Sequence, residues 1–266
     1  MSSIAAIGHL SRDVVAGGTP RPGGPVLYAA GALVTSGADT RVAASCAREH
    51  RGELLAPLEA LGVPVRWFES RATTAYSFHY EGDRRIMRQD AVGDPWSPEQ
   101  AVEAAGDAAW VHVGALVRGD FSAETLAALA AAGRTLLLDA QGLVRTPALG
   151  PLQTDGRIGD ELRHVAILKV DEEEARVLAR SAEPEALLEL GVAEVIYTLG
   201  SRGSYVVAGG AIERIPARSV AGAVDPTGAG DTFAATYLAA RAGGLGPIEA
   251  AHEATAAVAS FLEREP

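Results

Sequence analysis

The sequence has one cysteine, no long apolar run and fewer basic than acidic residues. Cys46 alone cannot form an intramolecular disulfide or a thiolate metal cluster, so we expect a small buried side chain in a reducing compartment, the cytoplasm. Arg12 and Asp13 interrupt the N-terminus too early for a secretory signal. The longest uncharged stretch, Pro22 to Ala38, is shorter than the ~20 apolar residues that span a bilayer, so no membrane span is expected.

The charge balance excludes one class of protein, and a missing motif disfavours another. With 23 Lys+Arg against 34 Asp+Glu, the formal net charge is −11, which excludes a generic nucleic-acid binder because phosphate backbones require clustered positive charge. The sequence also lacks a Gly-x-x-x-x-Gly-Lys-Ser/Thr run, which disfavours a P-loop NTPase. The hydrophobic content of 48% is that of a globular chain, and we expect a single domain over residues 1–266.

Short apolar runs alternate with helix-like segments along the chain. The expected strands are Ile4–Ile7, Val42–Ala44, Trp110–Val113, Leu136–Leu138, Val165–Leu168 and Val195–Thr198. The expected helices are Val26–Ser36, Glu53–Leu61, Pro98–Ala105, Ala123–Ala131, Glu172–Ala179, Pro184–Leu190 and a run over Ala234–Ala240. This alternation predicts an α/β fold of three layers, with helices on both faces of a mostly parallel central sheet. Ligands of such sheets bind beyond the carboxyl ends of the strands.

One region departs from this alternation. Thr74 to Tyr80 places an aromatic residue at every second position and is followed by a turn and by Arg84 to Arg88, which predicts an antiparallel hairpin. Ser11 to Val15 is a second extended segment that can join it. We interpret these segments, about residues 11–25 and 71–90, as a small antiparallel β lid, and the alternating aromatics would permit a homodimer through it.

The most informative segment is Asp225-Pro-Thr-Gly-Ala-Gly-Asp-Thr-Phe233, which directly precedes the helix-like run. Small residues before a helix leave backbone N–H groups free to bind an anion, and the helix dipole adds positive charge there. Asp231 would lie in the first helical turn, where its carboxylate can act as a general base toward an attacking alcohol. The alternative interpretation is a tight loop in which Asp231 only caps the helix.

These nine consecutive residues resemble the C-terminal signature of the ribokinase-like (PfkB) carbohydrate kinases. The resemblance implies the ribokinase-like three-layer fold and phosphoryl transfer from ATP to a hydroxyl of a small substrate. By the same resemblance, Gly228, Ala229 and Gly230 form the anion hole for the transferred phosphate, and Asp231 is the catalytic base.

Two further segments match this family in the expected order. Gly23-Gly24 resembles the N-terminal signature, whose glycines let the backbone approach the sugar. The segment Val195–Ser204 resembles the nucleotide-binding strand and turn, which makes Thr198, Gly200 and Gly203 candidate ATP contacts. An ordinary strand-turn-strand hairpin is the alternative for that segment.

The acidic segment from Lys169 to Glu174 stands where the family usually carries Asn-x-x-Glu near hydrated Mg²⁺. Asp171 replaces the Asn, so Glu174 is the candidate that holds Mg²⁺ through water, and Lys169 is a candidate ATP contact. A simple acidic helix N-terminus is the alternative. Relatives in this family use the region of Asp225 for K⁺, which makes Asp225 a candidate monovalent-cation ligand.

The substrate side resembles the myo-inositol kinase branch of the family. Ribokinase-type members carry an Asn after the Gly-Gly pair, where this sequence has Tyr28, which disfavours ribose. The segments that look like the myo-inositol kinases are Gly8–Asp13, Ala72–Tyr76 with Gly82–Arg85, and Leu138–Arg145.

The polar residues of these segments suit a polyhydroxylated ring. Asp13, at the end of the first strand, can accept hydrogen bonds from vicinal hydroxyls, Gln141 can donate and accept, and Arg145 offers fixed donors to a hydroxyl or the γ-phosphate. The alternative is that these residues occupy solvated turns and loops.

We therefore expect an ATP- and Mg²⁺-dependent kinase of a sugar or cyclitol, with myo-inositol as a candidate. The alternatives are a kinase of another sugar or of a nucleoside, and a non-catalytic sugar or nucleotide sensor. A dinucleotide-binding domain is disfavoured, because Phe233 occupies the position of the third glycine of that fingerprint.

Overall fold

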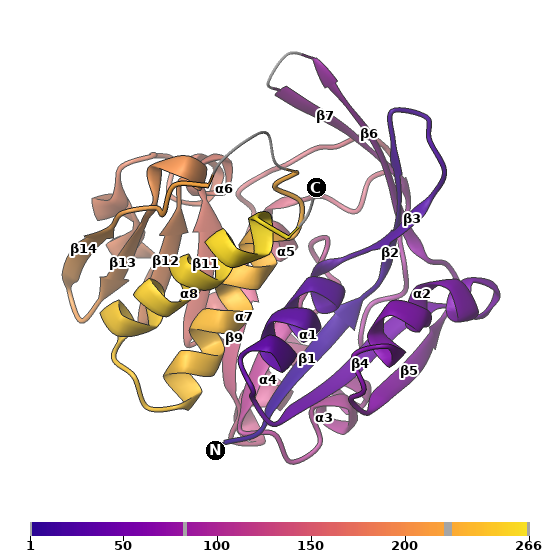
Figure 1. Cartoon of the computed structure of the whole chain (residues 1–266), viewed down its shortest axis with the longest axis horizontal. Coiled ribbons are helices and arrows are strands. Elements are labelled where there is room, and N and C mark those ends of the chain that lie inside the picture. The colour runs from indigo at the N-terminus through magenta and orange to yellow at the C-terminus, as the bar shows by residue number, and fades with distance from the viewer. Residues whose placement is uncertain (1, 82–83, 221–224, 265–266) are drawn as a thin grey trace.

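A nine-stranded sheet forms the centre of the computed structural model, which describes residues 2–81, 84–220 and 225–264 (Figure 1). Its strands lie in the order β14 (Ala211–Ile215), β13 (Ser204–Ala208), β12 (Glu194–Thr198), β11 (Ile167–Asp171), β9 (Thr135–Asp139), β8 (Trp110–Gly114), β1 (Ile4–His9), β4 (Thr40–Ala47) and β5 (Val65–Ser70). The strands from β12 to β5 are parallel, and β13 and β14 continue the sheet antiparallel. The predicted mostly parallel sheet is confirmed.

Helices cover both faces of this sheet, as predicted. One face packs against α1 (Pro25–Thr35), α2 (Arg51–Glu59), α7 (Ala229–Ala242) and α8 (Pro247–Leu262), and α1, α7 and α8 lie side by side in Figure 1. The other face packs against α3 (Pro98–Ala105), α4 (Ala123–Ala131), the short α5 (Gln141–Val144) and α6 (Glu172–Leu178). The segment Pro184–Leu190 is a 3₁₀ helix and not the predicted α-helix.

Local sequence explains where several of these helices begin. Ser97 Oγ accepts a hydrogen bond from the backbone N–H of Gln100, and Gln100 Oε1 accepts one from the backbone N–H of Ser97, so this capping box starts α3. Ser122 caps α4 through the N–H of Thr125. Among the described residues, no helix has the length and the apolar character to cross a bilayer.

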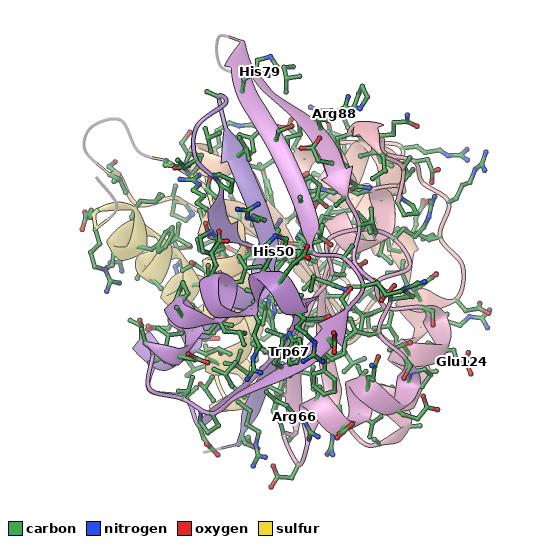
Figure 2. All side chains as sticks on the ribbon, turned by 90° about the vertical axis from the view of Figure 1, so that its right-hand side faces the viewer. His50, Arg66, Trp67, His79, Arg88 and Glu124 are labelled. Carbon is green, nitrogen blue, oxygen red and sulfur yellow. The ribbon has the colours of Figure 1, made fainter. Side chains whose placement is uncertain are left out.

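A second, smaller sheet lies at one edge of the molecule. Its strands run in the order β10 (Gly150–Pro151), β7 (Arg84–Ala91), β6 (Thr74–Glu81), β2 (Ser11–Val15) and β3 (Arg21–Gly23). The predicted β6–β7 hairpin is present, and Figure 2 shows it projecting from the body with His79 and Arg88 along it. β2 joins β6 in parallel, so this sheet is antiparallel except at that pair.

The aromatic side chains of the hairpin pack within the chain. Tyr76 and Phe78 are 2% and 3% exposed, so these two residues offer no open surface to a second subunit. Asp13 lies in β2, within the small sheet, and not at the end of the first strand as the sequence suggested. Both the homodimer and the movement of the small sheet as a lid stay predictions.

Truncation of the central core tests this architecture. Leu137 lies on β9 between β8 and β11 and is fully buried, so Leu137→Ala removes packed methyl groups that the rigid sheet cannot replace. We expect a loss of about 2–5 kcal/mol in the free energy of unfolding, measured by urea denaturation. Leu149→Ala is the matched control, because that side chain is 64% exposed, and we expect a change within about 0.5 kcal/mol. Equal losses for both variants would contradict this placement of the core.

Candidate active site

Polar residues gather where the central strands end. Asp139 is the last residue of β9, Asp171 of β11 and Thr198 of β12. Asp139 interacts electrostatically with Asp231 in the first turn of α7, and a Cβ at Gly230 would lie 3.3 Å from Nζ of Lys169 on β11, so the glycine-rich segment lies at the same edge of the sheet. This is the edge at which parallel α/β sheets bind their ligands.

The turn before α7 requires glycine. Gly228 has φ +84° as the N-cap residue, a backbone conformation that other residues rarely adopt. A Cβ atom at this position would lie 2.2 Å from the ring of Tyr28. Tyr28 itself packs edge-on against Phe261 of α8, with ring centroids 6.3 Å apart. The structure therefore places Tyr28, a predicted substrate residue, against the turn itself.

Asp231 lies in the first turn of α7 and is partly buried. Burial raises the pKa of its carboxyl to about 7, and the negative charge of Asp139 adds to this rise, whereas Lys169 and Arg145 oppose it. A carboxylate whose pKa is near neutrality can take a proton and release it again at physiological pH. This electrostatic setting fits the predicted general base.

Lys169 lies directly beside this turn. It is the only lysine among the 23 basic residues of the chain, and only 6% of it is exposed. Its Nζ lies 3.0 Å from Asp139 Oδ2 and 3.8 Å from Glu174 Oε2, and a Cβ atom at Gly230 would be 3.3 Å from it. Burial alone would lower the pKa of Lys169, but the two carboxylates raise it, so the side chain is an ammonium ion.

Asp171 and Glu174 form a capping box at the start of α6. Asp171 Oδ1 accepts a hydrogen bond from the N–H of Glu174 at 2.8 Å, and Glu174 Oε2 accepts one from the N–H of Asp171 at 2.7 Å. Burial, together with Asp139 and Asp171, raises the pKa of Glu174 despite the nearby ammonium of Lys169. The acidic helix N-terminus, which was the alternative interpretation of this segment, thus exists, and it holds a buried carboxylate beside Lys169.

These residues fit a water-mediated Mg²⁺ site better than a direct one. In the part of the chain that the structure describes, no three metal-ligating side chains come together to hold an ion. Glu174 Oε2 is already engaged by the N–H of Asp171. A Mg²⁺ ion held by donor phosphates could still reach Glu174 through its hydration shell, as Mg²⁺ commonly retains several waters.

Arg145 interacts electrostatically with both the small sheet and the first turn of α7. Its guanidinium interacts with Tyr76 of β6 and with the carboxylates of Asp139 and Glu174, and its charge also acts on Asp231. Burial raises the pKa of Tyr76 to about 12, so the hydroxyl stays protonated, and it donates to Leu116 O at 3.5 Å. Arg145 is thus a fixed cation close to the candidate base.

Asp13 and Gln141 flank the same region. Asp13 lies directly opposite Tyr76 in the register of β2 and β6 and is 8% exposed. Gln141 donates through Nε2 to Ala115 O at 3.1 Å, and its backbone N–H donates to Asp139 Oδ1 at 3.0 Å. Gln141 therefore connects the segment after β9 to the segment after β8, and one N–H of its side-chain amide is already bonded within the chain.

The glycine pair before α1 is tightly packed. A Cβ atom at Gly23 would lie 2.4 Å from Asp13 Oδ2, and one at Gly24 would lie 2.5 Å from His9 O. Gly24 also has φ +100° as the N-cap residue of α1. Both glycines are thus required where β3 meets α1 beside Asp13, whichever ligand binds there.

The candidate nucleotide contacts lie at the end of β12. Thr198 Oγ1 donates to Val170 O at 3.3 Å, and a short 3₁₀ turn over residues 200–202 leads into the antiparallel β13. Gly200 and Gly203 have φ +58° and +93°, and a Cβ at Gly203 would clash with Ile215 O at 2.3 Å. The alternative of a strand-turn-strand hairpin therefore describes this geometry, and the ATP contacts stay a prediction.

Asp225 has partners within the chain. Its Oδ1 accepts from the N–H and Oγ1 of Thr227, and its Oδ2 lies 3.2 Å from Arg21 Nη2. Burial would raise the pKa of Asp225, but these contacts lower it. With a guanidinium already beside the carboxylate, the predicted K⁺ site has no support from the observed contacts.

The sequence did not indicate the buried ion pair of His9 and Asp120. His9 Nδ1 lies 3.3 Å from Asp120 Oδ2, and His9 Nε2 is 2.8 Å from Asp94 O. Asp120 Oδ2 also accepts from the N–H groups of Leu116 and Val117. This pair fixes the loop whose Leu116 carbonyl receives the Tyr76 hydroxyl, but its members are too far apart in sequence for a local pattern to reveal it.

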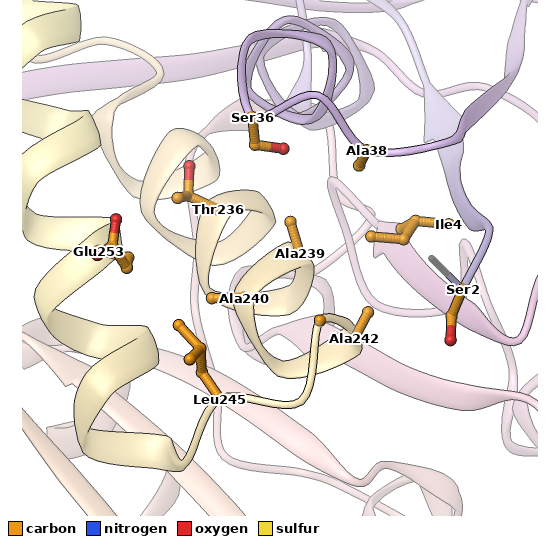
Figure 3. A pocket seen from close by; sticks show the side chains of 11 residues that line it. Ser2, Ile4, Ser36, Ala38, Thr236, Ala239, Ala240, Ala242, Leu245 and Glu253 are labelled. Atoms are coloured by element: carbon orange, nitrogen blue, oxygen red, sulfur yellow. The ribbon is translucent and has the colours of Figure 1, made fainter.

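A cavity of about 230 Å³ lies away from this site, at the far end of α7 (Figure 3). It is lined by Ser2, Ile4, Ser36, Ala38, Thr236, Ala239, Ala240, Ala242, Gly243, Leu245 and Glu253. It includes none of the predicted site residues.

The glycine turn, the partly buried carboxylate and the adjacent cations at the end of a three-layer α/β sheet define a phosphotransferase type of site. Residues 20–264 match the family described as pfkB family carbohydrate kinase, and the chain belongs to this family. The resemblance drawn from the nine-residue signature is therefore confirmed. A 2-dehydro-3-deoxygluconokinase of Thermoproteus tenax is 37% identical over 120 residues, a stretch that covers 42% of this chain and 37% of that relative.

Solved structures of the same fold extend over the whole chain. A pyrophosphate-dependent kinase in the ribokinase family, complexed with a pyrophosphate analog and myo-inositol, is 26% identical with a TM-score of 0.87, and the alignment covers 99% of this chain and 96% of that one. The Arabidopsis thaliana ribokinase complexed with ribose and ATP is 21% identical with a TM-score of 0.77, covering 100% and 94%. The second likeness concerns the fold alone.

Removal of the single lysine tests the electrostatics of the site. Lys169→Met keeps the length of the side chain but leaves Asp139 and Glu174 buried without their cation, so we expect a loss of about 3–5 kcal/mol in the free energy of unfolding at neutral pH. The loss should be smaller near about pH 5 than near about pH 8, because Lys169 lowers the pKa of Glu174, so its removal raises that pKa further and the stability of the variant falls as Glu174 ionises.

Urea denaturation at both pH values measures this difference. Arg202→Met is the control, because Arg202 is largely exposed and pairs with Glu172 instead of a buried carboxylate. A pH-independent loss, or an equal loss in the control, would refute the assigned electrostatics.

Proposed function

We propose that this protein transfers a phosphoryl group to a hydroxyl of a cyclitol or sugar, with myo-inositol as the first candidate acceptor. The observation that carries the proposal is the setting of Asp231, a carboxyl with its pKa near 7 in the first turn of a helix that begins at a glycine anion hole. Membership in the pfkB carbohydrate kinases supports the same reaction class. myo-Inositol is bound to a pyrophosphate-dependent kinase of similar fold, which favours it over ribose.

In the proposed reaction, the acceptor oxygen attacks the terminal phosphorus of the donor. The new O–P bond forms as the bond to the leaving phosphate breaks, and the hydroxyl proton passes to Asp231. The backbone N–H groups at Gly228, Ala229 and Gly230 would face the transferred group, where they stabilise its developing charge. Positioning and electrostatics supply most of the catalysis in such transfers.

The two buried cations have separate parts in this proposal. Lys169 lies beside Gly230, so its ammonium adds positive charge behind the anion hole. Arg145 reaches both Tyr76 and Asp231 electrostatically, so it can orient an acceptor hydroxyl toward the base or contact the phosphate. A Mg²⁺ ion held by the donor, with Glu174 contacting its waters, would neutralise phosphate charge.

The small sheet would close the acceptor side. Asp13, Gly23 and Gly24 lie on or next to its strands, so closure would exclude water as the acceptor binds. Water must be kept out, because it would otherwise compete with the hydroxyl for the phosphoryl group.

The phosphoryl donor has two candidates. The sequence resemblance implies ATP, with Thr198, Gly200 and Gly203 as contacts. A kinase of similar fold at 26% identity is pyrophosphate-dependent, whereas the ATP-bound ribokinase is at 21%. We therefore include inorganic pyrophosphate as a second candidate donor.

A matrix of donors and acceptors tests the function. Each of ATP and pyrophosphate, with Mg²⁺, is combined with myo-inositol, other cyclitols, hexoses, ribose and nucleosides, and phosphorylated product is detected by ³¹P NMR. We expect turnover of myo-inositol with one donor. Turnover of another acceptor alone would reject the cyclitol assignment, and no turnover with any pair would favour a non-catalytic sensor.

The same assay tests the base. Asp231→Asn keeps the size and polarity of the side chain but cannot accept the proton, so we expect kcat to fall by about 100-fold or more. Asp107→Asn is the control, because this carboxylate is 77% exposed and pairs only with Arg41 among the observed contacts. Near-normal turnover of Asp231→Asn would reject Asp231 as the base.

The pH profile gives an independent prediction. Because the pKa of Asp231 is about 7 and the base must be ionised, kcat/KM should rise with pH, with its midpoint near pH 7, and level off about one pH unit higher. Arg145 lowers the pKa of Asp231, so Arg145→Met should move the midpoint of the profile to higher pH. Initial rates between about pH 5.5 and 9 measure both profiles. A flat wild-type profile, or a midpoint that moves to lower pH in the variant, would contradict this assignment.

A further inference from the structure

An ion pair connects the small sheet to the segment that precedes the catalytic turn. Arg21 Nη2 on β3 donates to Asp225 Oδ2 at 3.2 Å, across 204 positions of sequence. The other carboxylate oxygen, Oδ1, accepts from the backbone N–H of Thr227 at 3.0 Å and from its hydroxyl at 2.6 Å. Asp225 thus receives Arg21 on one oxygen and Thr227 on the other.

Thr227 immediately precedes the N-cap residue of α7. Its neighbour Gly228 has φ +84°, and the N–H of Ala229 donates to Pro226 O at 3.1 Å, so the chain from Asp225 to α7 is one continuous turn. The direction of the anion-hole N–H groups depends on this turn. A shift of Asp225 would therefore be transmitted to Thr227 and onward to Gly228.

Arg21 also lies next to the acceptor side. In the register of β2 and β3 it is directly opposite Asp13, and directly opposite residues of an antiparallel pair project from the same face of a sheet. Two residues further along, Gly23 packs against Asp13 Oδ2. A movement of the small sheet onto an acceptor would carry Arg21 with it.

We propose that Arg21 is a positioning residue that couples the acceptor-side sheet to the catalytic turn through Asp225 and Thr227. This inference rests on the proposed phosphoryl transfer and adds a residue to it. Arg21 touches neither Asp231 nor the anion hole in the observed contacts of the described chain; it acts on them by fixing Asp225.

The pair is too exposed to matter much for folding. The side chains of Arg21 and Asp225 are 43% and 39% exposed, and ion pairs in such surroundings contribute little to stability. The same sheet supplies a matched pair for comparison. Arg12 on β2 lies 3.3 Å from Glu53 of α2, with exposures of 35% and 38%, and among the described residues no contact joins this pair to the turn before α7. A difference between the two pairs therefore reports on position and not on charge alone.

The test compares Arg21→Gln, Asp225→Asn, the double variant and Arg12→Gln in the phosphotransfer assay. We expect kcat to fall about tenfold in Arg21→Gln, with partial recovery in Arg21→Lys, and an unchanged kcat in Arg12→Gln. Because Arg21 acts through Asp225, the double variant should be no slower than Asp225→Asn alone. Additive losses, or equal rates for Arg21→Gln and Arg12→Gln, would overturn the proposal.

Amide hydrogen exchange keeps this test separate from that of the proposed function. In Arg21→Gln the amides from Thr227 to Asp231 should exchange faster than in the wild type, and in Arg12→Gln they should not. If the wild type transfers no phosphate from either donor, the proposed function fails, and faster exchange in Arg21→Gln alone still supports the link to the turn. Unchanged exchange in Arg21→Gln would overturn that link whether or not the protein is active.

Discussion

The site depends on one buried ammonium ion balanced by two carboxylates. Lys169 of β11 lies between Asp139, the last residue of β9, and Glu174 in the first turn of α6, and its Nζ also lies beside Gly230 in the first turn of α7. Without this cation, two buried negative charges would repel each other and any phosphate in the anion hole. The Lys169 ammonium thus has two effects. It neutralises the buried carboxylates of Asp139 and Glu174, and it adds positive charge beside the turn at Gly230, which favours the binding of an anion there.

Two independent constraints require glycine at position 228, the N-cap residue of α7. Gly228 must be glycine both for its left-handed backbone and because the Tyr28 ring occupies the space of a Cβ. Phe261 supports that ring from α8, so the last helix reaches the catalytic turn by way of Tyr28. The turn at Gly228 is therefore part of the packing between helices, and a larger side chain at Gly228 would displace Tyr28 and the turn together.

Local patterns predicted the parallel arrangement and six of the nine strands of the large sheet, but not β5, β13 and β14, and they did not predict contacts between residues far apart in the sequence. The helices Pro98–Ala105 and Ala123–Ala131 were predicted residue for residue, because Ser97 and Ser122 supply caps next to them. Pro184–Leu190 was predicted as an α-helix and is a 3₁₀ helix over the same residues, because the residue types that favour the two kinds of helix are similar. The nine-residue signature predicted the family. No local pattern marks His9 with Asp94, 85 positions apart, or Arg21 with Asp225, 204 apart, since only the folded chain brings them together.

The two candidate donors make different demands on this architecture. In the proposed reaction, both would present a terminal phosphoryl group to the turn at Gly228 and to the charges of Lys169 and Arg145. ATP must also place its base and ribose, and the candidate residues for that are at the β12–β13 turn, where Gly203 is required by Ile215 O within the chain itself. Pyrophosphate requires phosphate contacts alone. Because packing alone requires glycine at position 203, this glycine is no evidence for nucleotide binding. In this proposal the choice between ATP and pyrophosphate depends on the residues after β12 and not on the turn at Gly228.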